Sequence, residues 1–478
     1  MRPFSLLLST ILLSTFFRAP FVSIFVNAQR GQVLLTHQHE LLPQTLSEEA
    51  LDAVSRASID DHSTLILPQS PTPTLSNSKL NLDLHLKTRP TAVYRPSSLD
   101  AFHEGMRITQ HRRRDRTQTA EQKTNRYNVN WDIVHLDGPD VQDLHTLAQL
   151  ARMSGNAYAL GSSEKNWYEL DQAWNISFPF GFEDAQDGFR GHVFLSADNS
   201  TIVLAIKGTT LQGPTSKKDK FNDNLLFSCC CARVDFSWVF RQVCDCYSGS
   251  WNCDNTCLSD ALVEDSLFYT VGVNLVNDLR TLYPSANIWL VGHSLGGALA
   301  SLLGSTFGLP AVAFESPGER LAAERLGLPI PPGPNELLGS LELQVPSELD
   351  SDILPEILVT PSLSPTVHVY HTADPIPQGT CTGPFSPCSQ TGYALETHCH
   401  LGKSIVFDTV TELGWRVDVR KHPIKEVVGV MEMWGQEEDV RKPEREGRKK
   451  RKVPEAQAEV DCVDCYKWDF GDFKDKGL

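Results

Sequence analysis

The sequence predicts an α/β fold in which helices flank a mainly parallel central sheet. Two observations predict it. Short apolar runs at 287–291 and Ala311–Phe314 have the length of buried strands, and the apolar segment 298–307 between them has the length of a helix. A strand, a sharp turn, a helix and a second strand make a βαβ unit, whose two strands are parallel.

The other elements follow in order along the chain. Apolar residues at helical spacing predict helices at 141–150, 267–279 and 424–431, and short apolar runs predict strands at Gly191–Leu195 and Thr201–Ile206. The Pro- and Ser-rich segment 328–365 is expected to be a surface insertion, because a longer loop costs little extra closure entropy.

Composition divides the 478 residues into one large domain with appendages. Polar sequence rich in Ser, Thr and Pro precedes the first regular pattern near Trp131, and a charged stretch follows Trp434. We expect an N-terminal signal or membrane anchor at 1–28, a partly disordered stem at 29–125, a core domain at 126–435, and a charged tail at 436–478 that ends in a CxxC motif.

The N-terminus has the pattern of a secretory signal. Arg2 precedes an apolar run at 4–17, which is shorter than the roughly 20 residues that span a bilayer. Cleavage after Ala28 and retention as an uncleaved anchor are both open, because Arg18 interrupts the apolar sequence. In either case the rest of the chain enters the secretory lumen.

The net charge of −16 argues against a nucleic-acid partner.

Twelve cysteines indicate the same compartment, because an even number of thiols can pair fully in an oxidising lumen. Glycosylation sequons at Asn175 and Asn199 are consistent with it. A zinc site at Cys462-x-x-Cys465 is the competing interpretation, but no second CxxC completes a set of four ligands. We expect disulfides, no metal ion and no cofactor.

The segment Gly292-His293-Ser294-Leu295-Gly296 matches the nucleophile elbow of α/β-hydrolases, in which a serine occupies a strained turn between a strand and a helix. The pentapeptide alone is a weak signal. Here a predicted strand precedes it and a predicted helix follows it. We therefore predict an α/β-hydrolase fold with Ser294 as its nucleophile.

A serine nucleophile needs an acid and a base, which follow it in that order in this fold. Asp374 is the expected acid because it ends a strand-like run at 366–372, and Asp408 is the reserve candidate. The acid orients the base, which in turn takes the serine proton.

Three histidines follow Asp374 and could supply the base: His398, His400 and His422. We expect His422, because it lies on a loop just before the last predicted helix. His400 is the alternative, although the neighbouring Cys399 suggests a structural loop there.

The oxyanion that develops during acyl transfer needs donors that are already oriented. One is expected to be the backbone N–H of Leu295, directly after the nucleophile. The other is expected at Thr209, in the loop that follows the strand Thr201–Ile206. His293 flanks the nucleophile, and we expect it to support the site by packing.

With these residues placed, the sequence resembles the class 3 lipases and, more narrowly, the fungal autophagy-related vacuolar lipases. The resemblance covers about 131–434, together with a closing motif. It depends on these segments: Ile206-Lys-Gly-Thr-Thr210, Phe227-Ser-Cys-Cys-Cys-Ala-Arg-Val234, Gly292-His-Ser-Leu-Gly-Gly297, His371-Thr-Ala-Asp-Pro-Ile-Pro377, Glu396-Thr-His-Cys-His-Leu-Gly402 and Cys462-Val-Asp-Cys-Tyr-Lys-Trp468.

This resemblance implies a serine lipase or phospholipase that hydrolyses acyl esters of membrane phospholipids and triacylglycerol. It implies a single-pass type II protein of the endosomal multivesicular-body membrane that travels through the ER and Golgi to the vacuole. There it would disintegrate autophagic bodies and intralumenal vesicles. A loop before the last helix carries the base in class 3 lipases, which is the position of His422. A thioesterase or acyltransferase on the same fold and an inactive lipid-binding protein are the alternatives.

Seven cysteines between Cys229 and Cys257 fall where class 3 lipases carry a lid. We expect a Cys-rich, lid-like insertion here, and a small buried satellite core is the alternative. The apolar side chains expected to meet the bilayer are Phe227, Trp238, Val239, Phe240 and Trp251.

Overall fold

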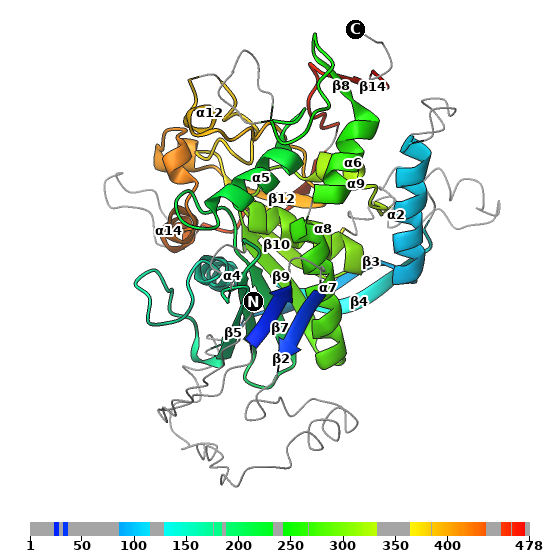
Figure 1. Cartoon of the computed structure of the whole chain (residues 1–478). Coiled ribbons are helices and arrows are strands. Elements are labelled where there is room, and N and C mark those ends of the chain that lie inside the picture. The colour runs from blue at the N-terminus through cyan, green and yellow to red at the C-terminus, as the bar shows by residue number, and fades with distance from the viewer. Residues whose placement is uncertain are drawn as a thin grey trace, which may run out of the picture.

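The computed structural model describes residues 23–27, 32–36, 86–114, 129–174, 176–183, 188–232, 242–265, 267–331, 364–383, 385–435, 451–459 and 461–473. A ten-stranded sheet runs through the molecule in the order β13-β12-β11-β10-β9-β7-β6-β5-β1-β2 (Figure 1). Its strands are β1 (Ser23–Asn27), β2 (Gln32–Thr36), β5 (Ile176–Phe180), β6 (Gly191–Leu195), β7 (Thr201–Ile206), β9 (Asn287–His293), β10 (Ala311–Phe314), β11 (Thr366–His371), β12 (Lys403–Phe407) and β13 (Gln457–Ala458).

The five central strands from β7 to β12 pair in parallel, and the strands that flank them pair antiparallel on both sides. β7 and β10 are buried along their whole length, as parallel strands covered by helices on both faces must be. This arrangement confirms the predicted α/β-hydrolase sheet. The pairing of Phe314 with His293 and with Val369 aligns the carboxyl ends of β9, β10 and β11 at one edge of the sheet.

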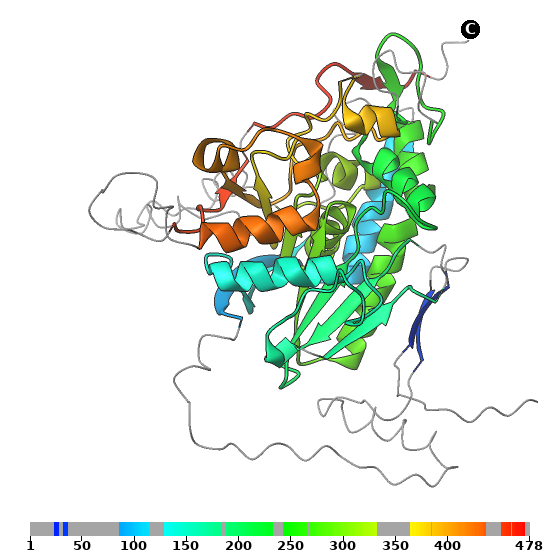
Figure 2. The same cartoon turned by 90° about the vertical axis from the view of Figure 1, so that its left-hand side faces the viewer.

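Helices cover both faces of this sheet. They are α2 (Leu99–Arg114), α4 (Leu144–Asn156), α5 (Ser216–Phe227), α6 (Asn255–Asp265), α7 (Leu267–Leu282), α8 (Leu295–Phe307), α9 (Arg320–Leu326), α12 (Pro387–Thr391), α13 (Thr409–Leu413) and α14 (Ile424–Trp434). Figure 2 shows α4 in teal and α14 in orange lying side by side on one face. The other face is covered by α7 and α8.

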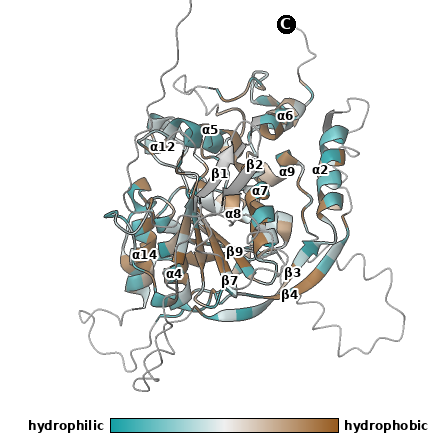
Figure 3. Ribbon diagram, turned by 60° about the horizontal axis from the view of Figure 1, so that its bottom comes forward, coloured by the Kyte–Doolittle hydropathy of each residue, from teal (hydrophilic) through white to brown (hydrophobic). Residues whose placement is uncertain are grey.

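Two hydrophobic cores result, one on each face of the sheet. Successive strand residues alternate between them: Leu204 packs with α7 and α8, whereas Val203 packs with α4 and α14. Figure 3 shows the apolar central strands enclosed by helices with hydrophilic outer faces. The helix predicted at 298–307 begins three residues earlier, at Leu295, and ends at Gly308, whose φ of 58° is the left-handed conformation that terminates many helices.

Part of the expected stem is ordered and packs on the core domain. β3 (Thr88–Pro96) in the stem pairs antiparallel with β4 (Trp131–Pro139), and the Nη2 of Arg95 in β3 donates to the carbonyl of Gly308 at 3.2 Å. The backbone of β1 and β2 forms a hairpin at the edge of the main sheet beyond β5. The division into four segments stays a prediction.

The C-terminal segment (451–473) is bound to the core domain at both of its ends. β13 pairs with β12, and β14 (Asp469–Gly471) pairs with β8 (Asn252–Asp254). All twelve cysteines form disulfides: Cys229–Cys465, Cys230–Cys253, Cys231–Cys244, Cys246–Cys257, Cys381–Cys388 and Cys399–Cys462. The expected disulfides are confirmed. Because Cys462 and Cys465 have separate partners far away in sequence, the zinc interpretation of their spacing is wrong.

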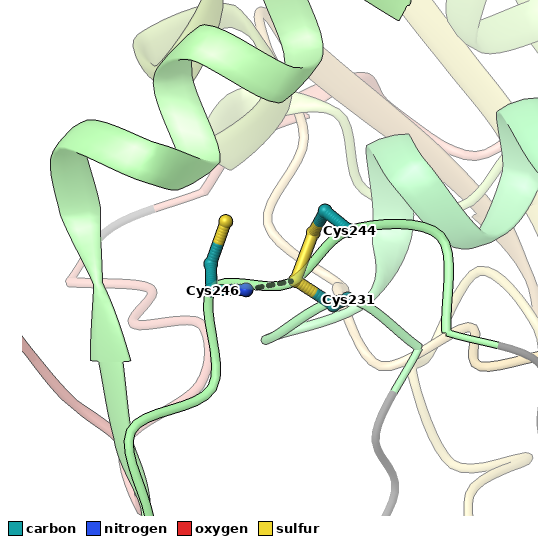
Figure 4. Close-up of side chains that lie close together, drawn as sticks. All are labelled: Cys231, Cys244 and Cys246. Atoms are coloured by element: carbon teal, nitrogen blue, oxygen red, sulfur yellow. Dashed lines mark hydrogen bonds between the residues drawn. A yellow bond between two sulfur atoms is a disulfide. The ribbon is translucent and has the colours of Figure 1, made fainter. Parts of the chain in front are cut away.

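The Cys-rich insertion forms a satellite core rather than an apolar surface in its described part. Figure 4 shows the Cys231–Cys244 disulfide, whose Cys231 Sγ accepts a hydrogen bond from the backbone of Cys246 at 3.3 Å. The indole of Trp251 packs edge-on against Trp468 of the C-terminal segment, with ring centroids 5.1 Å apart. The satellite core consists of Cys229, Cys230, Cys231, Cys246, Cys253, Leu258, Cys465 and Trp468.

The expectation that Phe227 meets the bilayer is wrong, because this side chain is fully buried in the main core at the end of α5. Trp238, Val239 and Phe240 lie outside the described residues, as does the sequon residue Asn175. Asn199 lies in the turn between β6 and β7. Among the described helices, we find none that is both long enough and apolar enough to span a bilayer.

Candidate active site

The nucleophile elbow lies at the carboxyl end of β9. Ser294 has φ 57° and ψ −128°, a conformation that is strained for any residue other than glycine. Close backbone approach explains the two flanking glycines. A Cβ on Gly292 would lie 2.3 Å from the backbone of Gly296, and a Cβ on Gly296 would lie 2.1 Å from the carbonyl oxygen of Ile206. Any larger residue at either position would open the turn.

Three predicted residues form one hydrogen-bonded chain at this turn. The Nε2 of His422 lies 2.9 Å from the Oγ of Ser294, and its Nδ1 lies 2.6 Å from the Oδ2 of Asp374. The carboxylate only accepts, so Nδ1 carries the ring proton and Nε2 is free to accept the serine proton. This is the relative geometry of nucleophile, base and acid that acyl transfer requires.

His293, the residue before Ser294, holds His422 in position through a hydrogen bond. The Nε2 of His293 donates to the backbone carbonyl of His422 at 2.8 Å, and the hydroxyl of Tyr158 donates to its Nδ1 at 2.8 Å. Burial lowers the pKa of His293 to about 3, so this imidazole is neutral and keeps that single tautomer. His293 therefore positions the loop that carries His422.

Asp374 is fully buried at the carboxyl end of β11. Its Oδ1 accepts a hydrogen bond from the backbone N–H of Ile376 at 2.9 Å, so the same side chain also caps its own turn. Burial raises the pKa of Asp374, but His422 and the hydrogen bonds to the carboxylate outweigh burial and lower the pKa below its ordinary value. The reserve candidate Asp408 instead caps α13 by accepting from the backbone of Thr411.

The other two histidine candidates lie in the contact with the C-terminal segment. The Nδ1 of His400 is 2.6 Å from Glu459, and its Nε2 donates to the carbonyl of Ser316 at 3.1 Å. His398 pairs with Asp464 at 3.1 Å. Both His400 nitrogens are thus engaged away from Ser294, and the loop with Cys399 has the structural role that its disulfide suggested.

The loop after β7 is braced by a buried ion pair. The Nζ of Lys207 lies 2.7 Å from the Oδ2 of Asp219 in α5, and that oxygen also accepts from the backbone N–H of Thr210 at 2.9 Å. Gly208 allows the loop to approach the elbow, because a Cβ there would lie 2.1 Å from the carbonyl oxygen of His293. Thr209 is therefore fixed between Gly208 and Thr210, beside the turn that leads into α8.

The side chain of Thr209 faces a second buried carboxyl group. Its hydroxyl donates to the Oδ2 of Asp223 at 2.5 Å. Burial raises the pKa of Asp223 to about 7, and the neighbouring charge of Asp219 adds to the rise. This carboxyl group therefore changes its charge near neutral pH, at the edge of the site.

A cavity of about 600 Å³ opens above Ser294 and His422. Thr209 and Asp223 lie on one wall. The apolar part of the lining comes from several separate segments of the chain: Tyr158, Leu211, Ile376, Tyr393, Leu395, Val419 and Ile424. Its size and apolar lining suit an extended hydrocarbon chain next to the nucleophile.

Sequence reasoning missed Tyr158, Asp219, Asp223 and a further buried acid, Glu315. The two aspartates are one helical turn apart in α5, and nothing in their spacing distinguishes them from a solvated helix face. Two groups of side chains have metal-like proximity in the described part of the chain, Cys231 with Cys244 and Cys246, and His398 with Cys399 and Cys462. Their sulfurs are oxidised to disulfides and offer no thiolate ligand.

Comparison with known proteins identifies the family of this chain. The model of the family "Lipase (class 3)" matches residues 213–309, which include the elbow. The "Putative lipase ATG15" of Cryptococcus neoformans var. neoformans (strain B-3501A) is 44% identical over 394 residues, covering 72% of this chain and 70% of that protein. This chain belongs to the ATG15 family of fungal class 3 lipases. It is a lipase, an enzyme that hydrolyses acyl esters.

Other members of the ATG15 family extend this similarity. The protein of the same name from Saccharomyces cerevisiae (strain S288c) is 41% identical over 361 residues, covering 74% of this chain and 61% of that protein. Among solved structures, lipase II from Rhizopus niveus aligns at 15% identity with a TM-score of 0.25, covering 55% of this chain and 80% of that one. The fold assignment rests on the strand order and on family membership.

Proposed function

We propose that this ATG15-family lipase hydrolyses acyl esters of phospholipids and triacylglycerol with Ser294 as nucleophile, His422 as base and Asp374 as acid. The observation that carries the proposal is the continuous hydrogen-bonded chain from Asp374 through His422 to Ser294, which opens into an apolar cavity. An inactive lipid-binding protein needs no such chain.

In the first half of the proposed reaction, the Nε2 of His422 takes the proton of Ser294 while Oγ attacks the ester carbonyl carbon. The backbone N–H groups of Leu295 and Thr209 stabilise the oxyanion of the tetrahedral intermediate. As the ester C–O bond breaks, His422 returns the proton to the leaving alcohol. In the second half, His422 deprotonates a water molecule, which attacks the acyl-serine and releases the fatty acid.

Membrane lipids are the proposed substrates because exposed apolar side chains lie on the segments that line the cavity or close to them in sequence. Leu211 lines the cavity and is 72% exposed, and Phe385, which is 88% exposed, lies two residues before the cavity-lining helix α12. Val417 is also exposed, two residues before the lining residue Val419. Exposed apolar groups that rim an apolar cavity are typical of a surface that meets lipid.

The proposed place of action is the lumen of the endosomal and vacuolar system, where the enzyme would degrade the membranes of autophagic bodies and intralumenal vesicles. The ATG15 name of its relatives and the six disulfides, which persist only in an oxidising compartment, support this proposal. We further propose that residues 1–28 act as a signal or a single-pass type II anchor, in which case β1 (Ser23–Asn27) leaves the edge of the sheet in the mature enzyme. We also propose that Asn199 and Asn175 are glycosylated.

The test measures fatty acid released from phosphatidylserine-containing vesicles and from triolein emulsion by the purified full-length protein. We expect Ser294→Ala and His422→Ala to lose activity by a factor of about 10⁶. His398→Ala is the control, because this half-exposed histidine pairs with Asp464 and lies outside the hydrogen-bonded chain.

Activity that survives Ser294→Ala would exclude the proposed mechanism. If wild type hydrolysed only acyl thioesters, and Ser294→Ala and His422→Ala abolished that activity, the chain would instead be a thioesterase. Transfer of the acyl group to an added alcohol in preference to water would identify an acyltransferase on the same fold.

A further inference from the structure

A buried acid that the hydrogen-bonded chain does not use lies directly behind it. Glu315 follows β10, the strand between those that carry Ser294 and Asp374 at their ends. It is fully buried, and its φ of 44° is a conformation that strains any residue except glycine. Its backbone N–H nevertheless continues the sheet by donating to the carbonyl of Val369 at 3.0 Å. The fold therefore holds this side chain in place against local strain.

The contacts of Glu315 do not neutralise a negative charge. Its Oε1 accepts from the backbone N–H of His371 at 3.0 Å, and Oε2 has no donor to accept from. The ion-pair partner of Glu315 within the described residues is the His371 imidazole at 3.6 Å. Burial lowers the pKa of His371, and its Nε2 donates to the carbonyl of Lys421 instead. Among the residues that the structure describes, the other titratable groups that face Glu315 are Asp374 and, more weakly, the phenol of Tyr370.

Glu315 and Asp374 nevertheless follow neighbouring parallel strands, and their side chains lie close enough to act on each other's pKa. Two carboxyl groups this close can form a hydrogen bond only if one of them carries a proton, because carboxylates only accept. Asp374 is the partner that stays ionised, since it also faces the His422 ring and the N–H of Ile376. Burial and the charge of Asp374 raise the pKa of Glu315 well above its ordinary value, which agrees with a proton on Glu315.

We propose that Glu315 is a positioning residue that remains protonated, donates its proton to a hydrogen bond with Asp374, and thereby extends the activity of the enzyme to lower pH. This inference rests on the proposed catalytic roles of Ser294, His422 and Asp374. A neutral donor withdraws negative charge from the Asp374 carboxylate. That carboxylate then stabilises a positive charge on the His422 ring less strongly, which favours activity in more acidic solution.

The test compares kcat/KM between pH 4 and pH 8 on a soluble short-chain ester, using full-length wild type, Glu315→Gln and Glu315→Met. Glutamine matches the shape of the protonated acid and can both donate to Asp374 and accept from His371. We expect its acid limb to coincide with that of wild type. Methionine fills the space without a donor, and we expect its acid limb to move to higher pH by about one unit. If the Glu315→Met protein does not accumulate, Glu315→Gly is used in its place, because glycine adopts a positive φ without strain.

Two results would overturn the proposal. A move of the acid limb to lower pH in Glu315→Gln would mean that wild-type Glu315 is ionised, and would overturn the proposal. If both variants kept the acid limb of the wild-type pH profile, Glu315 would act only through packing, and the proposal would be overturned as well. Ser294→Ala is assayed alongside to test the catalytic roles separately. Residual activity of Ser294→Ala would refute the proposed catalytic roles. If Ser294→Ala is inactive and the Glu315 variants show no shift of the acid limb, only the inference about Glu315 is refuted.

Discussion

The hydroxyl of Thr209 donates to the carboxyl group of Asp223 across 2.5 Å at the wall of the cavity that contains Ser294. The expected oxyanion donor is therefore coupled to an acid whose pKa is raised to about 7 by burial. Below this pH the wall of the site is neutral, and above it a negative charge lies beside the place where the oxyanion forms.

The first prediction is that wild-type activity falls above about pH 7 and that Asp223→Asn removes this fall, because an amide does not ionise. The free energy of unfolding should also decrease more between about pH 4 and pH 7 in wild type than in Asp223→Asn, since Asp223 in the folded chain holds a proton that the unfolded chain releases. Measuring kcat/KM from pH 5 to 9 checks the first effect, and urea unfolding checks the second. Asp278→Asn, at a raised-pKa site in α7 outside the cavity lining, should keep the wild-type profile.

The second prediction concerns the acid of the hydrogen-bonded chain. Asp374→Asn should lower kcat by about 10⁴, because the amide can donate to His422 Nδ1 and so stabilise the wrong tautomer of the ring. Asp408→Asn, which changes only the cap of α13, should keep kcat within a factor of a few. Steady-state kinetics on a soluble ester distinguish the two. Equal losses in both variants would mean that Asp374 acts through stability alone.

The third prediction concerns the exposed apolar residues Leu211, which lines the cavity, and Phe385, which lies two residues before the cavity-lining helix α12. Leu211→Ser and Phe385→Ser should reduce hydrolysis of phospholipid vesicles about tenfold when combined, because they remove apolar area that would enter the lipid. Hydrolysis of a monomeric short-chain ester should stay unchanged. Ile133→Ser is the control, because this residue is 54% exposed but lies on the β3–β4 ribbon and does not line the cavity. A parallel loss on both substrates would contradict a role in lipid contact.

The fourth prediction concerns the C-terminal segment. Replacing Cys399 and Cys462 together by Ser should destabilise the protein by about 4 kcal/mol, because the disulfide closes a loop with a sequence separation of 63 residues. Removing the Cys381–Cys388 disulfide, with a separation of 7, should cost only about 2 kcal/mol. Unfolding midpoints in urea measure both. Equal losses in the free energy of unfolding would mean that tethering the C-terminal segment stabilises the protein no more than closing a short local loop.

The strands, the helices and the sharp turn at Ser294 could be predicted because their signals are local. Ser294 needs only a strand before it, a helix after it and glycines on both sides, and all of these can be read within twenty residues. His422 followed from its place before the last helix. The sequence pattern showed the type of each residue and its approximate place at the edge of the sheet, which is sufficient when the fold always brings the same strand ends together.

The buried acids could not be predicted, because their roles depend on which strands are neighbours. Glu315 lies against Asp374 only because β10 separates β9 from β11, although 58 residues separate the two acids in sequence. Phe227 was wrongly expected at the bilayer for a similar reason: nothing in its neighbourhood indicates that the last turn of α5 points into the main core. The cysteine partners were equally hidden, since spacing alone does not determine connectivity.

Three consecutive cysteines, Cys229, Cys230 and Cys231, have partners at sequence distances of 236, 23 and 13 residues. During synthesis, Cys231 and Cys230 can meet their partners early, whereas Cys229 must wait until Cys465 has emerged. A thiol that waits beside two oxidised neighbours is open to exchange with them. Maturation of this enzyme should therefore depend on a disulfide isomerase, and recombinant production in a reducing compartment should give mispaired, inactive protein even when the sequence is correct.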